Sequence, residues 1–141
     1  MGMSEQESDN FLSNGRILRV ASIGPNGEPH IAPKAYLYEN GKFYVQTGPQ
    51  SRKARNIKAN SKVAFSVDVG ERFSEFKAVV GRGTARILTN SKFDVEIGKR
   101  ILLKYFGDLN SPAAKQLANL EHVLIEITPT TKISWDYSKS S

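Results

Sequence analysis

Residues 16–47 read RILRVASIGPNGEPHIAPKAYLYENGKFYVQT, and two Asn-Gly pairs divide this stretch into three short strand-like segments. Asn26-Gly27 and Asn40-Gly41 each favour a tight hairpin turn, because asparagine and glycine tolerate the positive φ angles that such a turn requires. We therefore expect a meander of three neighbouring antiparallel strands, over residues 16–23, 30–38 and 42–47.

The rest of the chain continues the pattern of short strands with few helices between them. We expect further strands over residues 62–69, 75–88, 121–127 and 132–137, with Pro129 separating the last two. Helices are expected directly after Ser51, over residues 92–106 and over residues 112–120. Gly81 and Gly83 lie inside the fifth strand and indicate a bulge or a close backbone approach. Because hairpins rather than helices join most strands, we expect a mainly β (α+β) fold, a small antiparallel barrel of six to seven strands, closed or partly closed, with a few short helices.

Length and composition are those of a single globular domain. The chain has 141 residues, of which 39% are hydrophobic and 24% are charged. Residues 1–10 hold three acids and no base, and we expect them to form a flexible acidic tail before a domain over residues 11–141. No apolar run approaches the roughly 20 residues of a membrane span, and the chain does not open on a signal segment, so we expect a cytoplasmic protein.

The chain contains no cysteine and only two histidines, His30 and His122. Disulfides, thiolate nucleophiles and cysteine-based metal sites are therefore excluded, and we expect no metal site. Redox chemistry would need a bound organic cofactor. The formal net charge is +6, and because the acidic tail contributes −3, the remaining residues carry +9. This balance indicates an anionic partner, either a phosphorylated cofactor or a nucleic acid, unless it serves solubility alone.

The segment GPQSRKARNIKAN, residues 48–60, places cations at an unusual position in a helix. Ser51 is expected to cap the helix. Arg52 and Lys53 then fall in its first turn, where the partial positive charge of the helix disfavours them by roughly 0.3–1 kcal/mol each. A bound anion would reverse that cost, because backbone N–H groups, a hydroxyl and two cations would converge on it. The segment therefore predicts a phosphate site; the alternative is a solvated basic helix face.

Two neighbouring strands are expected to reach this corner. Gln46 and Thr47 end the third strand directly before the basic helix. The second strand contains Ala32-Pro33-Lys34-Ala35-Tyr36, in which small residues leave room for a flat ring beside the backbone and Pro33 lacks a backbone donor. An ordinary edge strand protected by a proline is the alternative interpretation. No residue stands out as a general acid or base, so the catalytic residues stay unassigned.

The stretch from Arg19 to Asp68 resembles the core of the pyridoxamine 5′-phosphate oxidase-like family of FMN-binding split barrels. The resemblance rests on the order of four motifs, VAS, NGEPHIAP, FYVQT and SRKARNI, and continues more loosely through GRGTARI at residues 81–87. It covers a little over half of the chain. It implies a split barrel that forms a homodimer and holds FMN at the subunit interface.

The resemblance also assigns roles to residues of this chain. The residues that it implies in cofactor binding are Ala32, Pro33, Lys34, Tyr36, Gln46, Thr47, Ser51, Arg52, Lys53, Lys77 and Trp135. Residues 51–53 match the phosphate grip, residues 46–47 match strand-end contacts to the flavin, and residues 32–36 match the strand along the flavin ring. Trp135 is similar to an aromatic residue that the partner subunit brings near the flavin; a core or interface aromatic is the alternative.

The activity that the resemblance implies is that of an FMN-dependent oxidoreductase. Members that oxidise pyridoxamine 5′-phosphate carry substrate motifs with arginine and histidine near the C-terminus, whereas this chain has no arginine after Arg100. We therefore expect a substrate other than a vitamin B6 compound. Relatives on this fold resemble binders of the deazaflavin F420 and of haem, which are alternative cofactors. Further alternatives are a flavin carrier without turnover and a nucleic-acid-binding barrel, for which Phe43 and Tyr44 would be exposed strand aromatics.

Overall fold

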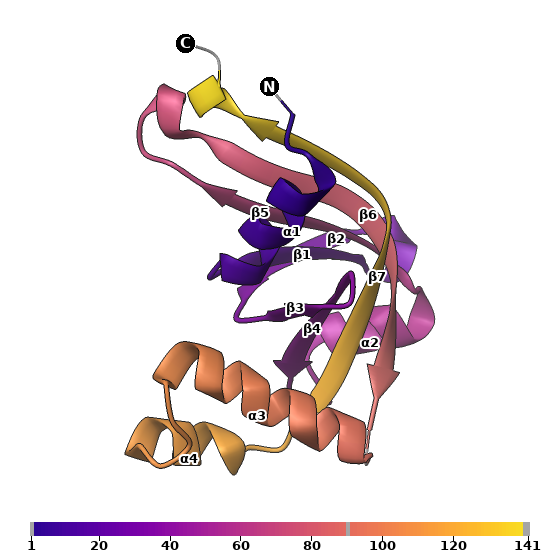
Figure 1. The fold of residues 1–141 in the computed structure, drawn as a ribbon. Helices are drawn as coiled ribbons and strands as arrows, with labels where there is room; N and C mark the ends of the chain where they lie inside the picture. Colours follow the sequence, from indigo (N-terminus) through magenta and orange to yellow (C-terminus); the bar gives the residue numbers. More distant parts are fainter. Residues whose placement is uncertain (1, 90, 140–141) are drawn as a thin grey trace.

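The computed structural model describes residues 2–89 and 91–139. Seven antiparallel strands form one sheet in the spatial order β2-β1-β5-β6-β7-β4-β3, which curls into a half-barrel (Figure 1). The strands are β1 (Leu18–Ile23), β2 (Pro29–Lys34), β3 (Leu37–Glu39), β4 (Lys42–Thr47), β5 (Lys62–Val69), β6 (Lys77–Leu88) and β7 (Val123–Asp136). The helices are α1 (Glu5–Asn14), α2 (Arg52–Ala59), α3 (Lys92–Phe106) and α4 (Pro112–Ala118), with single turns η1 (Pro25–Gly27), η2 (Phe73–Glu75) and η3 (Tyr137–Lys139). The expected fold class is confirmed. None of the helices in the described ranges is long and apolar enough to cross a membrane.

Both Asn-Gly hairpins form as the sequence predicts. Asn26 and Gly27 have φ angles of 61° and 77°, and Asn40 and Gly41 have φ angles of 54° and 76°. Asparagine and glycine enter this left-handed region at lower cost than other residues. The two turns join β1 to β2 and β3 to β4 as antiparallel pairs.

The expected three-stranded meander is wrong, because its middle strand is broken into β2 and β3, which lie at opposite edges of the sheet. Between them, the N–H of Tyr36 donates to the hydroxyl of Tyr105 (3.0 Å), and the carbonyl of Tyr36 accepts from Lys104 Nζ (2.9 Å). Side chains of α3 thus replace a neighbouring strand as hydrogen-bond partners. Only two residues separate β2 from β3, so the two sheet edges come within about 11 Å of each other there. The barrel is split at this crossing.

The last two expected strands are one continuous strand, β7. Pro129 does not end β7, because the pairing of β7 with β6 shifts register beside Gly83. The resulting bulge accommodates Pro129, which has no backbone N–H to donate to the neighbouring strand. The predicted close backbone approach at the two strand glycines is confirmed. A Cβ atom at Gly81 would collide with the carbonyl oxygen of Thr131, and one at Gly83 would lie 2.5 Å from that of Thr128.

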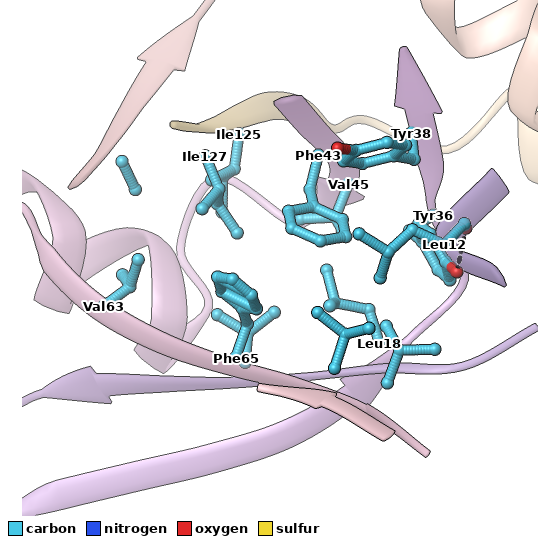
Figure 2. Packing of buried hydrophobic residues seen from close by; sticks show 14 of the residues in the cluster. Leu12, Leu18, Tyr36, Tyr38, Phe43, Val45, Val63, Phe65, Ile125 and Ile127 are labelled. Carbon is cyan, nitrogen blue, oxygen red and sulfur yellow. Dashed lines mark hydrogen bonds between the residues drawn. The ribbon is translucent and has the colours of Figure 1, made fainter. Parts of the chain in front are cut away.

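The barrel core is built from aromatic and branched side chains (Figure 2). Phe43 is fully buried, and its ring centroid lies 4.8 Å from that of Phe65. A second cluster forms around Tyr44, which packs with Ile97 and Ile101 of α3. β4 is therefore buried on both faces, which explains its nearly continuous apolar sequence. Phe43 and Tyr44 are not exposed aromatics, so the nucleic-acid interpretation loses that support.

Residues 5–14 form helix α1, where the sequence pointed to a flexible acidic tail over residues 1–10. A capping box starts the helix: the N–H of Glu7 donates to Ser4 Oγ (3.1 Å), and the N–H of Ser4 donates to Glu7 Oε1 (2.9 Å). Leu12 is fully buried in the barrel core, and its carbonyl accepts the hydroxyl of Tyr36 (Figure 2). Local capping and an apolar anchor therefore give this acidic segment a regular structure.

Candidate functional site

The start of α2 is tied to the end of β4, as the sequence predicts. Ser51 caps the helix: its Oγ accepts the N–H of Ala54 (3.1 Å) and the hydroxyl of Thr47 (3.0 Å). The N–H groups of Arg52 and Lys53 occupy the first two helical positions, so the helix itself provides no acceptor for them. This corner therefore presents backbone donors and a hydroxyl group at the end of β4.

Lys53 of α2 and Lys34 of β2 bring two ammonium groups near one another. Lys53 is only 3% exposed and Lys34 is half-buried. Burial, followed by the charge of Lys34, lowers the pKa of Lys53 to about 8, and burial also lowers the pKa of Lys34. Neither lysine forms an ion pair with any carboxylate in residues 2–89 and 91–139. Ammonium groups that are withdrawn from water and lack an acidic partner are stabilised by a bound anion.

Arg52 lies in a different environment from Lys53. It is exposed and lines a separate cleft of about 670 Å³ together with Arg55, Asn56 and Pro25. The sequence analysis expected Ser51, Arg52 and Lys53 to converge on one point, but Arg52 lines the neighbouring cleft instead. Successive side chains on a helix point about 100° apart, and this rotation separates the side chains of Arg52 and Lys53.

A cavity of about 240 Å³ opens at the end of β4. Three residues that the sequence singled out line it together: Lys34, Gln46 and Thr47. The remaining walls come from α3, from α4 and from the segment that leads into β7, and Figure 1 shows these helices together at the bottom of the view. The structure thus brings the ends of β2 and β4 to one cavity.

His122 is a residue of this cavity that sequence reasoning did not select. Its Nε2 lies 2.8 Å from Gln46 Nε2, and its Nδ1 lies 2.8 Å from the carbonyl oxygen of Leu120. The contact arises because β7 pairs with β4, so that Val123 lies opposite Thr47. No local signal in the sequence indicates that β4 and β7, which are far apart along the chain, are neighbouring strands.

Strand β2 is an edge strand whose side chains alternate between half-buried and exposed positions. Ala32 and Lys34 are half-buried, whereas Pro33 is exposed on the opposite face. Tyr36 is not part of the cavity wall: its ring is fully buried in the core and its hydroxyl donates to Leu12. Only the backbone of Tyr36 lies near the crossing between β2 and β3.

Lys77 and Trp135 are not brought to this corner within one chain. Lys77 pairs with Asp136 across the β6–β7 ribbon, with Lys77 Nζ 3.8 Å from Asp136 Oδ2, and Trp135 pairs with Ala78. Val123, beside the cavity, begins β7 and Asp136 ends it, so about 40 Å of strand separates the two regions. Within one chain, Lys77 and Trp135 therefore lie at the far end of β7 from this corner.

Comparison with known proteins gives a family for the chain. The family model described as pyridoxamine 5′-phosphate oxidase matches residues 4–136. The 5a,11a-dehydrotetracycline/5a,11a-dehydrooxytetracycline reductase of Streptomyces rimosus is 41% identical over 76 residues, which cover 50% of this chain and 54% of that protein. The matched region therefore spans only about half the length of this relative.

Solved structures agree with the sheet topology. A conserved hypothetical protein from Mycobacterium tuberculosis is 28% identical with a TM-score of 0.87, over 98% of this chain and 88% of that chain. An FAD-binding protein from Mesorhizobium loti is 22% identical with a TM-score of 0.68, over 95% of this chain and 93% of that chain, and this likeness concerns the fold. Because the family model covers nearly the whole chain and the split half-barrel is present, this chain belongs to the pyridoxamine 5′-phosphate oxidase family.

Proposed function

We propose that the chain is an FMN-binding flavoprotein that acts as an oxidoreductase on a substrate other than a vitamin B6 compound. The observation that carries this proposal is the pair of ammonium groups on Lys53 and Lys34, which lie near the start of α2 without a carboxylate partner in the described residues. A phosphate monoester would neutralise both groups, and each charge-assisted hydrogen bond would contribute roughly 1.5–3 kcal/mol.

The residues at this corner fit a terminal phosphate. Ser51 Oγ, the N–H groups of Arg52 and Lys53, and Lys53 Nζ would surround it. Lys34 and the backbone of β2 would then lie along the ring, while Oε1 of Gln46 and the side chain of Thr47 would meet its polar edge from the end of β4. When bound, the flavin would supply hydride transfer at its N5. Lys34 would stabilise negative charge that develops on the ring, because its ammonium is half-buried and already close to the cavity.

We propose further that two copies of the chain share the cofactor at their interface. Edge strand β2 exposes Ile31 to 65%, and β7 exposes Ile133 to the same extent. Apolar side chains exposed on a free strand edge favour pairing with another chain. A second copy would also bring Lys77 and Trp135 within reach of the corner. Sedimentation is expected to give a dimer that retains flavin, whereas a flavin-bearing monomer would contradict the shared site.

Replacement of Lys53 tests the phosphate assignment. Lys53→Ala should weaken FMN binding by roughly 10- to 150-fold, the equivalent of one charge-assisted hydrogen bond. The matched control is Lys58→Ala, which removes an exposed cation from the same helix. Flavin content is read from visible absorption of the purified protein, and circular dichroism checks the fold. Equal FMN content in Lys53→Ala and Lys58→Ala would contradict the assignment.

The cleft on the exposed side of α2 favours F420 as a second candidate cofactor. Arg52 and Arg55 line this cleft, and neither pairs with a carboxylate in the described part of the chain. The long anionic tail of F420 would suit these two guanidinium groups. Arg52→Ala with Arg55→Ala should then weaken F420 binding far more than FMN binding, and an equal effect on both would remove F420 from consideration. At the cavity, His122 has no free ring nitrogen for a haem iron, because both of its ring nitrogens are engaged.

A further inference from the structure

The cavity at the end of β4 has an apolar side that none of the cofactor predictions uses. Ile101, Leu102 and Phe106 of α3 form part of this wall, and Leu117 and Leu120 close it from α4 and the segment after it. Leu117 and Leu120 are 46% and 58% exposed, so they stand at the mouth of the cavity. Water-accessible leucines that line a cavity are stabilised when an apolar ligand covers them.

A fixed polar pair faces this apolar wall. The carbonyl oxygen of Leu120 can only accept a hydrogen bond, so Nδ1 of His122 must carry the proton that binds it. In the neutral ring, Nε2 then has no proton and accepts an N–H from the carboxamide of Gln46. Gln46 keeps its second N–H and its Oε1, and no residue in the described ranges bonds to either of them. The carboxamide is thus oriented and still has a donor to offer.

Gly98 of α3 leaves room for the carboxamide of Gln46. Gly98 lies in the middle of α3, where glycine is less favourable than alanine by roughly 1 kcal/mol. A Cβ atom at this position would lie 2.5 Å from Gln46 Nε2. The helix therefore leaves the space that the carboxamide occupies, and Gln46 is held between α3 and His122.

We propose that this cavity, here called the ring chamber, binds the substrate of the flavoprotein, and that the substrate is an uncharged, planar compound of one or two rings with a carbonyl oxygen. The volume of about 240 Å³ lies below the roughly 300–1,000 Å³ of pockets for drug-sized ligands. The charged groups that line it are one cation, Lys34, and one anion, Glu121, so the lining has no excess charge. The second N–H of Gln46 would bind the carbonyl oxygen. The inference rests on the proposed function only in calling the occupant a substrate.

Coumarin, a neutral two-ring lactone, is the probe. Its dissociation constant is measured by ligand-detected NMR on the purified protein, with and without FMN, while FMN content is read separately from visible absorption. Leu117→Trp fills the mouth of the chamber and should weaken coumarin binding by at least about tenfold. Leu103→Trp is the matched control, because Leu103 is a similarly exposed leucine (44%) of α3 that does not line the chamber. Gln46→Leu should also weaken binding, by roughly 2- to 12-fold for one neutral hydrogen bond.

The outcomes separate this inference from the flavin proposal. The ring chamber is supported if Leu117→Trp weakens coumarin binding, Leu103→Trp leaves it unchanged, and the FMN content is the same in both variants. The same pattern in a protein that never binds FMN supports the chamber and overturns the flavin proposal. The ring chamber is overturned if coumarin does not bind, or if it binds equally to both tryptophan variants. It is also overturned if coumarin displaces FMN stoichiometrically, because the cavity would then belong to the flavin ring.

Discussion

Replacement of Gly98 by alanine measures the contact between α3 and Gln46. In the interior of a helix, alanine is favoured over glycine by roughly 1 kcal/mol, so Gly98→Ala should stabilise an isolated α3. In the folded chain, the new Cβ atom would lie 2.5 Å from Gln46 Nε2, and the side chain of Gln46 would have to move away. That movement breaks the hydrogen bond between Gln46 and His122, at a net cost of roughly 0.5–1.5 kcal/mol.

The two effects nearly cancel in the single variant and separate in a double-mutant cycle. Gly98→Ala alone should change the free energy of unfolding by less than about 0.5 kcal/mol. In a Gln46→Ala background the obstacle is absent, and the same substitution should stabilise the protein by roughly 1 kcal/mol. The coupling free energy between the two positions is therefore expected to be about 1 kcal/mol.

Urea unfolding of the four proteins of the cycle, followed by circular dichroism, measures this coupling. The midpoint should shift while the slope with denaturant stays constant, because neither substitution changes the surface exposed on unfolding by much. Additivity within about 0.3 kcal/mol would refute the reasoning, because it would mean that the carboxamide of Gln46 does not occupy the space beside Gly98.

Three further predictions concern charge and anchoring. Burial and the neighbouring Lys34 lower the pKa of Lys53 to about 8, so FMN binding should weaken as the pH rises through and above this value, and this weakening should be smaller with Lys53→Met. Burial of Glu126 opposes its ionisation, but hydrogen bonds from Arg86 and another side chain outweigh burial and lower its pKa below the ordinary 4.5. Its contribution to stability is therefore present above pH 4.5 and lost as the pH falls through the lowered pKa, and thermal unfolding of Glu126→Gln should lack this acid-side loss. Tyr36→Phe removes the hydroxyl that donates a hydrogen bond to the carbonyl of Leu12 in α1. Amide hydrogen exchange in α1 should therefore accelerate, while exchange in β5 and β6 stays unchanged.

Elements that depend on local backbone preferences could be predicted from the sequence. Both Asn-Gly turns have the positive φ angles that these residues tolerate. Helix α3 begins after Ser91 and ends at Gly107, whose φ of 78° is the left-handed conformation typical of a helix C-terminus. Ser51 caps α2 with the expected hydrogen bond to Ala54. In each case the signal and the structure that it predicts lie within a few residues of each other.

The same kinds of local signal gave wrong predictions where contacts with distant parts of the chain competed with them. Residues 5–10 read as a disordered acidic tail, but the burial of Leu12 in the barrel and a capping box give them helical structure. Pro129 read as the end of a strand, but pairing with β6 carries β7 past it through a bulge. The step from Lys34 to Leu37 read as part of one strand, but α3 supplies its hydrogen-bond partners instead.

The sequence by itself determined the turns, the helix caps and the group of residues at the basic end of α2, because each depends on dihedral preferences and on charges that are close along the chain. Only the tertiary structure decided the order of the strands, the burial of Lys53 beside Lys34, and the contact of Gln46 with His122 and Gly98. Those features depend on which side chains are buried against one another. This is decided by packing over the whole sheet, between residues up to about a hundred positions apart, and the local sequence does not indicate which residues will be partners.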